Sequence, residues 1–94
     1  MPRSPLSQAE ISARLAAIPR WQLVNGEIVR TFEFPDFTAS LAFVNKVGQL
    51  AESANHHPDI DIRYNKVRLA LVTHDAGGLT NNDFDLAAKI ESLA

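Results

Sequence analysis

Two stretches of alternating apolar and polar residues, each containing a turn signal, constrain the fold of this chain more than any other feature. In the first, Asn25-Gly26 separates a short apolar run from an alternating segment over 27–34. Asn-Gly is the strongest two-residue hairpin signal because both of its residues tolerate positive φ. In the second, Asn65 separates an alternating segment ending at Tyr64 from another over 67–71. The pattern predicts two β-hairpins, and therefore four strands.

Helical patterns precede, separate and follow the hairpins. Ser7 and Glu10 form a capping-box sequence ahead of apolar residues at helical spacing, and Pro19 ends that helix. Thr80 and Asp83 form a second capping box ahead of a last helix, and capping is the role we expect for Asp83. No strand–helix–strand alternation is present, so the sequence predicts an α+β fold: a four-stranded antiparallel sheet with three helices packed on one face.

The middle helix has a wider apolar face than one sheet requires. Asp36 is a favourable N-cap for it, and the helical pattern covers 37–55. Its apolar residues form two stripes, namely Phe37, Leu41, Val44, Gly48 and Ala51, and Phe43, Val47, Leu50 and Ala54. Either both stripes lie in the core or one packs against a second subunit. Arg30 interrupts the apolar side of the second predicted strand, which suggests an edge or an interface.

Composition limits the range of functions. The 94 residues fit a single domain over 1–94, in which 1–5 are expected to form a flexible tail. The nine basic residues are spread out and the net charge is −2, so direct nucleic-acid binding is not expected. The absence of cysteine excludes disulfides, thiolate metal sites and cysteine nucleophiles. No membrane-spanning run or signal peptide is evident, so we expect a cytoplasmic protein.

The second hairpin is expected to bring distant histidines together. If Tyr64 and Lys66 flank its turn, the numbers of paired residues add up to about 130, and His74 lies opposite or close to His56. His57 is next to them in the chain. Histidine titrates near neutral pH, so such a cluster can both accept and donate a proton.

Each of these polar residues also has a structural explanation. A lone histidine is more often a surface residue or a satisfied core residue, but three converging histidines favour a functional cluster. A three-histidine metal site is the rival chemistry, although the adjacent His56 and His57 would need a bent backbone to bind one ion. Glu52 is placed one turn earlier to orient an imidazole ring. Asp59 and Asp61 fall on the polar side of a strand, where solvation alone accounts for them.

The same residues resemble the pterin-4a-carbinolamine dehydratase family. Seven positions have the spacing of that family's signature: Glu52, His56, His57, Pro58, Tyr64, His74 and Asp83. The likeness extends to Trp21, to the segment 30–37 and to Phe43-Val44, and it covers the chain from about Leu6 to the end.

The resemblance implies a fold, an activity and an assembly. The fold is the antiparallel sheet with three helices that the hairpins predict. The substrate is the 4a-hydroxytetrahydropterin left by a pterin-dependent aromatic amino acid hydroxylase, and the product is the quinonoid dihydropterin. No metal and no organic cofactor are needed. Subunits form a homodimer or homotetramer, partly through the long helix 37–55 and a sheet edge.

The resemblance and the expected register together suggest roles for individual residues. His56 and His74 are the expected proton-transfer pair, and His57 is expected to bind and orient the pterin. The further candidates for substrate binding are Glu52, Asp59 and Asp61, and the motif positions of structural character are Pro58, Tyr64 and Asp83. Two other functions stay open: a non-catalytic dimerisation or assembly module of the same fold, and a metal-dependent hydrolase.

Overall fold

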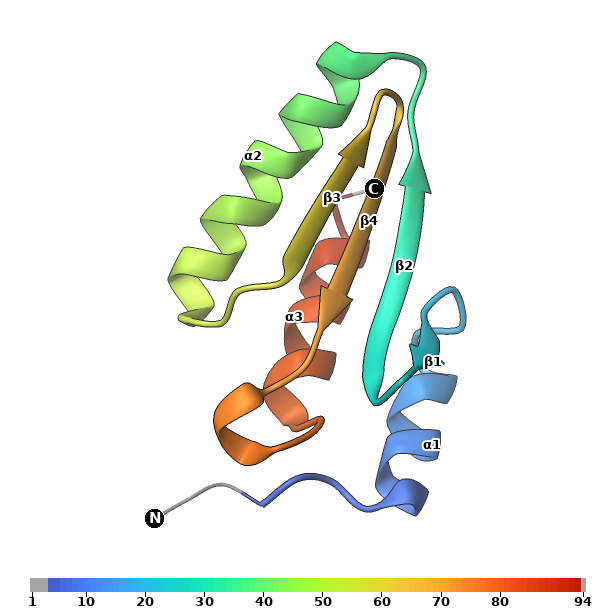
Figure 1. Cartoon of the computed structure of the whole chain (residues 1–94), viewed down its shortest axis with the longest axis vertical. Coiled ribbons are helices and arrows are strands. Elements are labelled where there is room, and N and C mark those ends of the chain that lie inside the picture. The colour runs from blue at the N-terminus through green and yellow to red at the C-terminus, as the bar shows by residue number, and fades with distance from the viewer. Residues whose placement is uncertain (1–3, 94) are drawn as a thin grey trace.

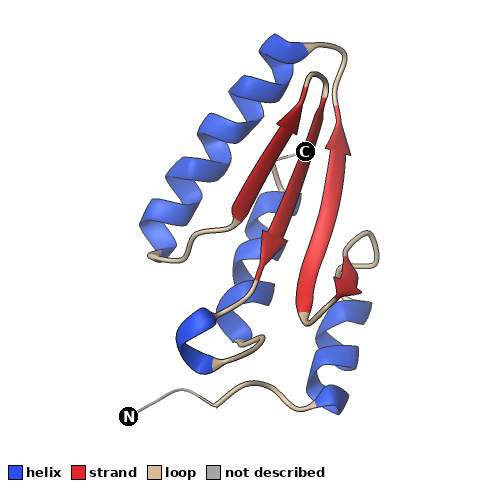
Figure 2. Cartoon of the chain, viewed as in Figure 1, coloured by secondary structure: helices blue, strands red, loops and turns tan. Residues whose placement is uncertain are grey.

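The computed structural model describes residues 4–93 and has an α+β architecture (Figures 1 and 2). Its elements are α1 (Gln8–Ala16), β1 (Gln22–Val24), β2 (Glu27–Glu33), α2 (Phe37–Ala54), β3 (Asp59–Arg63), β4 (Lys66–Leu71), the short 3-10 helix η1 (His74–Ala76) and α3 (Asn81–Glu91). The strands form one sheet in the order β1-β2-β4-β3, and all neighbours are antiparallel. The predicted fold class and order of elements are confirmed.

The helices begin where the sequence places caps. Ser7 and Glu10 form the predicted capping box, in which the Glu10 carboxylate accepts the Ser7 backbone N–H at 2.9 Å. This backbone hydrogen bond lowers the pKa of Glu10, so the contact stabilises the start of α1 at neutral pH and is lost in acid. Asp36 caps α2 by accepting the Ala39 N–H at 2.8 Å.

The hydrophobic core lies between the sheet and the helices. Alternate residues of β2 and β4 point to this side, as the period of two in a strand requires. Its most buried members include Ile28, Phe32, Phe43, Val47, Val67, Leu69, Leu71, Phe84, Leu86 and Ile90. The rings of Phe32 and Phe43 pack with centroids 4.6 Å apart, which joins the sheet to α2.

The register of the second hairpin differs from the predicted one by a residue. β3 ends at Arg63, which pairs with Lys66, so paired residue numbers add up to 129. Tyr64 is the first residue of a two-residue turn, with φ of 52°, and is not the last residue of the strand. The observed register sets apolar residues opposite one another, as Ile60 is opposite Leu69. The predicted register would have placed the apolar residues of β3 opposite the residues on the polar side of β4. That pairing is excluded because one face of the sheet is buried.

Arg30 is held inside the domain. Of the two expected positions, an edge or an interface, the edge was wrong, because β2 lies between β1 and β4. The guanidinium lies 3.9 Å from the ring centroid of Phe32 and forms an ion pair with Glu91. Glu91 also accepts the Trp21 indole N–H at 2.7 Å. Arg30 therefore joins the middle of the sheet to the end of α3.

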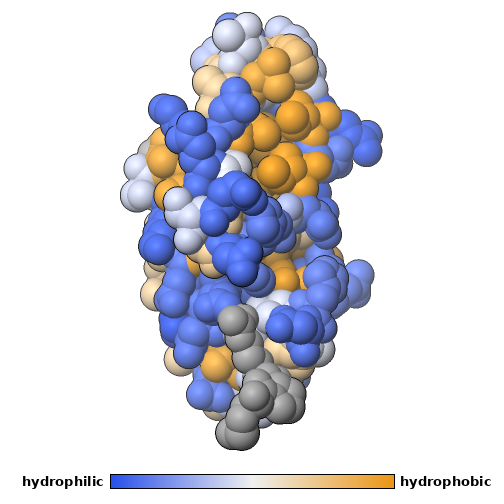
Figure 3. Space-filling view, turned by 90° about the vertical axis from the view of Figure 1, so that its left-hand side faces the viewer, coloured by the Kyte–Doolittle hydropathy of each residue, from blue (hydrophilic) through white to orange (hydrophobic). Residues whose placement is uncertain are grey.

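The two apolar stripes of α2 have different surroundings. Phe43 and Val47 of one stripe are buried in the core. Phe37 and Leu41 of the other are 45% and 41% exposed. Figure 3 shows apolar residues gathered on the face of the molecule that carries α2. The core of one subunit therefore uses only part of the wide apolar face.

The N-terminal segment is attached to the loop before α3. The Leu6 N–H donates to the Leu79 carbonyl at 2.8 Å. Of the predicted tail over 1–5, residues 1–3 lie outside the described residues. Within 4–93, no helix combines the length and apolarity needed to cross a membrane.

We expect Leu69→Ala to lower the free energy of unfolding by about 2–5 kcal/mol, because the side chain is fully buried and its loss leaves a cavity. Urea denaturation followed by circular dichroism measures the change. Thr31→Ala, at an exposed position of β2, is the control and should change stability by less than about 0.5 kcal/mol. Equal losses in the two variants would contradict the assigned core.

Candidate active site

The end of α2 determines where His56 and His57 lie. Asn55 adopts the left-handed conformation with φ of 50°, which asparagine tolerates better than most residues. The His56 N–H then reaches back to the Ala51 carbonyl at 3.1 Å, the bond of a Schellman motif. This motif ends the helix sharply and turns both histidines toward the start of β3.

His74 reaches the same region from the end of β4. Thr73 and Gly78 form an isolated antiparallel bridge that closes a loop, and η1 with His74 lies within this loop. His56 and His74 both lie beyond the paired ladder, so they are not strand partners, but they lie close to each other, which the prediction also allowed. They meet through the loops that follow α2 and β4.

All three histidines line one open hollow of about 320 Å³. Its lining consists of Asn55, His56, His57, Val72, His74 and Asp75. His57 and His74 are exposed, whereas the His56 side chain is only 11% exposed. The imidazole cluster is therefore open to a ligand from solvent and is anchored at His56.

The anchor of His56 is a buried carboxylate. His56 Nε2 lies 2.5 Å from Asp83 Oδ1, and the Asp83 side chain has no exposed surface. The other oxygen, Oδ2, accepts the Thr80 backbone N–H and the Thr73 hydroxyl, both at 2.9 Å. Asp83 has its expected capping role in α3, but that interpretation missed the bond to His56. Only its place in the signature spacing hinted at a second role.

His57 has a partner of a different kind. Its Nε2 contacts the Glu52 carboxylate from the last turn of α2. The His57 and Glu52 side chains are 56% and 79% exposed, so the contact adds little stability. It restricts the orientation of the His57 ring, as the sequence suggested for Glu52.

The remaining predicted residues lie outside this hollow. Asp59 and Asp61 are exposed on β3 and do not contribute to the lining. Tyr64 is at the far end of the β3–β4 hairpin and is 64% exposed. Pro58 is half-buried between His57 and β3, where it separates the histidines from the strand.

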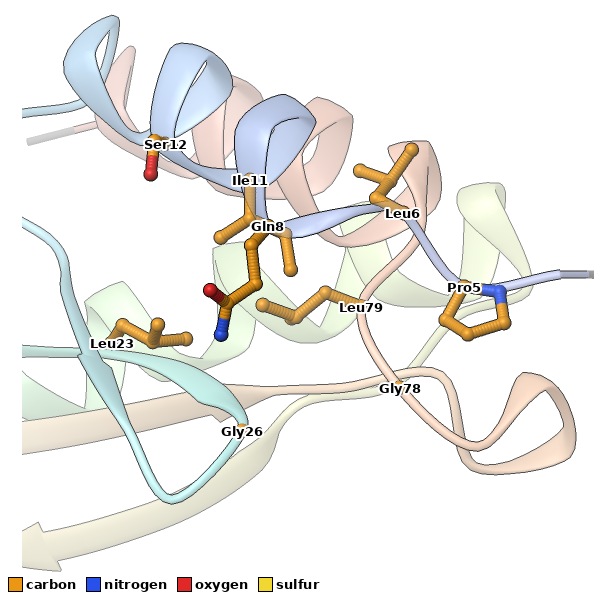
Figure 4. Close-up of a pocket in the computed structure, with 9 residues that line it drawn as sticks. All are labelled: Pro5, Leu6, Gln8, Ile11, Ser12, Leu23, Gly26, Gly78 and Leu79. Atoms are coloured by element: carbon orange, nitrogen blue, oxygen red, sulfur yellow. The ribbon is translucent and has the colours of Figure 1, made fainter.

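A second hollow, of about 340 Å³, lies between the N-terminal segment, the β1–β2 turn and the loop before α3. Figure 4 shows Ile11, Leu23 and Leu79 around it, together with the Gln8 carboxamide. No titratable side chain lines it. It is unsuited to proton transfer, whereas the histidine hollow has three imidazoles in its lining and is the candidate active site.

The fold and the site define a class of protein. An α+β domain presents three imidazoles at an open hollow, and a buried carboxylate supports one of them. Within the described residues, no group of three or more histidine, aspartate or glutamate side chains is placed to hold a metal ion. Imidazoles that share an open hollow are chemically able to donate and accept protons.

Comparison with known proteins identifies the family. The model of the pterin 4 alpha carbinolamine dehydratase family matches residues 4–93. A protein of Acidobacterium capsulatum with the provisional name pterin-4-alpha-carbinolamine dehydratase is 65% identical over 94% of this chain and 96% of its own. A protein of Chloroflexus aurantiacus with the same provisional name is 63% identical over 99% and 98%. The chain belongs to the pterin-4-alpha-carbinolamine dehydratase family, as its motifs predicted.

Solved structures agree with this assignment. A transcriptional coactivator/pterin dehydratase from Brucella melitensis has a TM-score of 0.92 and 33% identity, covering 97% of this chain and 99% of its own. A pterin dehydratase-like protein described as a RuBisCO assembly factor in the alpha-carboxysome has a TM-score of 0.65 and 26% identity, covering 80% and 87%. The fold therefore occurs in proteins described with different roles.

Asp83→Ala should destabilise the domain by about 1–3 kcal/mol or more, because it removes the shared acceptor of His56, Thr73 and Thr80 and leaves buried donors unsatisfied. Thermal denaturation measures the loss. Asp85→Ala, on the same helix but 61% exposed, is the matched control and should cost less than about 1 kcal/mol. A smaller loss for Asp83→Ala than for Asp85→Ala would refute the structural role of the buried carboxylate.

Proposed function

We propose that this protein dehydrates a 4a-hydroxytetrahydropterin to the quinonoid dihydropterin and water by histidine acid–base catalysis. The observation that carries the proposal is the convergence of three imidazoles at one hollow in a chain of this family. Histidine is suited to the reaction because it can donate and accept protons near neutral pH. The hollow is open to solvent, so a planar pterin can reach the imidazole rings.

The chemistry is an elimination with two proton transfers. One imidazolium donates a proton to the 4a-hydroxyl, and the C4a–O bond breaks to release water. A neutral imidazole accepts the proton from N5, and the electrons of that N–H bond form the C4a–N5 double bond. The two imidazoles then exchange a proton through solvent to restore the starting state. No oxidant or reductant is required.

We assign His56 and His74 as the proton-transfer pair and His57 as the residue that orients the pterin. His56 precedes β3 and His74 follows β4, so both lie at the open end of the β3–β4 hairpin, where they line the same hollow. His57 is held by Glu52 at the solvent side. Asp59 and Asp61 stay candidates for the pterin's guanidine-like edge, but their place outside the lining makes them the weaker part of the assignment.

His56→Ala and His74→Ala should each lower kcat by roughly 10²- to 10⁴-fold, the usual contribution of a general acid or base. His57→Ala should act mainly on KM because it removes a binding contact. Stopped-flow absorbance of a freshly generated carbinolamine measures both constants. Thr31→Ala, at an exposed position of β2 with no assigned role in the site, is the control and should keep both constants unchanged. Full turnover by folded His56→Ala and His74→Ala proteins would refute the assignment.

A second candidate function is a non-catalytic interaction module. One structural neighbour is described as a transcriptional coactivator as well as a pterin dehydratase, and another as an assembly factor. Such a role would use the surface of the domain and would not need the histidines. Because this chain has all three histidines at one hollow, we favour the enzyme. Absence of any acceleration of carbinolamine decay by the purified protein would favour the module.

We further propose that the exposed apolar surface binds a second copy of this chain. Four large exposed apolar residues lie on α2 or on β3 and its turn, namely Phe37, Leu41, Ile60 and Tyr64. β3 is an edge strand, and its outer side has no partner within the described residues. An apolar surface beside an open strand edge favours self-association.

Leu41→Glu should shift the protein toward the monomer in analytical ultracentrifugation, because a charge would be buried at the contact. Ala42→Glu adds the same charge one residue further along α2, about 100° around the helix, and should leave the oligomer unchanged. If both variants sediment like the unmodified protein, α2 is not the contact.

A further inference from the structure

We infer that Thr73 is a positioning residue that acts through Asp83 on His56. In this role it keeps the His56 proton on Nε2, so that Nδ1 is the nitrogen that exchanges protons at the hollow. The catalytic meaning of this inference rests on the proposed dehydratase function. The orientation of the groups rests on hydrogen bonds alone.

The direction of each hydrogen bond follows from the atoms involved. The Thr73 hydroxyl lies 2.9 Å from Asp83 Oδ2 and 2.7 Å from the Thr80 hydroxyl. A carboxylate can only accept, so Thr73 donates its single hydrogen to Asp83. Its oxygen is then left to accept from Thr80. The Thr80 oxygen accepts the Asn82 N–H at 3.3 Å, so the hydrogen-bonded chain has one direction throughout.

The hydrogen bonds of Asp83 determine which nitrogen of His56 carries the proton. Oδ2 is occupied by Thr73 and by the Thr80 N–H, and Oδ1 is left for His56. All partners of the carboxylate are donors, so His56 Nε2 must carry a hydrogen. The neutral ring is therefore the Nε2–H tautomer, whose lone pair lies on Nδ1.

Nδ1 of His56 is accessible to a ligand. It has no hydrogen-bond partner within residues 4–93, and no buried side-chain nitrogen or oxygen of these residues lacks one. Nδ1 must therefore reach the surface, and His56 is part of the lining of the hollow. A proton from the substrate enters at Nδ1, and Asp83 stabilises the resulting imidazolium.

Thr73 is placed to link both members of the proposed pair. It is 2% exposed, and its backbone pairs with Gly78 at 3.2 and 3.3 Å to close the loop that carries His74. It directly precedes His74 and is hydrogen-bonded, through Asp83, to His56. A β-branched side chain has few χ1 rotamers, so its hydroxyl direction is well defined. Thr73 therefore helps to fix the position of the His56 ring relative to the His74 ring.

The test compares two substitutions of Thr73. Thr73→Val keeps the shape and removes the hydroxyl, whereas Thr73→Ser keeps the hydroxyl. We expect Thr73→Val to lower kcat roughly tenfold, a part of the usual acid–base contribution, with KM changed less than about twofold. Thr73→Ser should retain most of the turnover. Thr31→Val, at an exposed position of β2, is the control and should have no effect.

Nuclear magnetic resonance of ¹⁵N-histidine-labelled protein directly tests which ring nitrogen of His56 carries the proton. The His56 signals are assigned by comparison with the His57→Gln and His74→Gln variants. The neutral His56 ring should have its proton on Nε2 in the unmodified protein. In Thr73→Val, the Asp83 carboxylate loses one of the donors that fix its direction and can turn away from His56, so both tautomers should be populated. A proton on Nδ1 in the unmodified protein, or full kcat in folded Thr73→Val, would overturn the inference.

The outcomes separate this inference from the proposed function. If Thr73→Val does not fold, Thr73→Ala removes the same hydroxyl without a larger side chain, and full kcat in that folded variant would overturn the inference. If His56→Ala loses turnover while Thr73→Val keeps it, the dehydratase assignment stands and the positioning role fails. If the unmodified protein has no dehydratase activity, the proposed function fails. The ¹⁵N spectrum still shows which nitrogen of His56 carries the proton.

Discussion

The fully buried carboxylate of Asp83 is the constraint on which the site depends. A charge without exposed surface is tolerated only when hydrogen-bond donors surround it. Its donors come from three parts of the chain: His56 after α2, Thr73 after β4 and the Thr80 N–H at the start of α3. Any shift of one part leaves a buried group unsatisfied, so the three chain segments are held together.

The rest of the domain serves to bring these three segments to one place. β4 pairs with both β2 and β3, and the residues of its buried side contact α2 and α3 across the core. The histidines lie on loops where α2 and β4 end, which exposes them to solvent on a rigid support. The Arg30 and Trp21 contacts to Glu91 hold the opposite end of α3. The helix that supplies Asp83 is therefore restrained at both ends.

The candidate active site and the exposed apolar residues of α2 lie at different ends of this helix. His56 and His57 follow its C-terminus, whereas Phe37 and Leu41 lie in its first turns. Because the two lie apart, substitutions can alter the histidine site without altering the apolar surface of the helix, and the reverse. The description of one neighbour as a coactivator as well as a dehydratase, and of another as an assembly factor, agrees with such independence.

Local patterns were sufficient for much of this fold. The capping residues and turn signals lie within a few positions of the backbone they shape, so they predicted the helix starts, the hairpins and the histidine-bearing ends of α2 and β4. The register of β3 and β4 was predicted one residue off, because whether Tyr64 belongs to the strand or the turn depends on burial across the sheet. The edge position considered for Arg30 was wrong for a similar reason, since its partner Glu91 is 61 residues away.

The sequence alone determined the order of elements, the α+β class and the family, because these follow from short-range spacing and from a signature of seven positions. It also named the three histidines. Only the tertiary structure decided that Asp83 supports His56, 27 residues distant, and that Thr73 supports Asp83. Capping explained Asp83 locally, so nothing in the linear pattern required a further partner. The partner is selected when α3 packs against the end of α2 and the buried carboxylate must be satisfied.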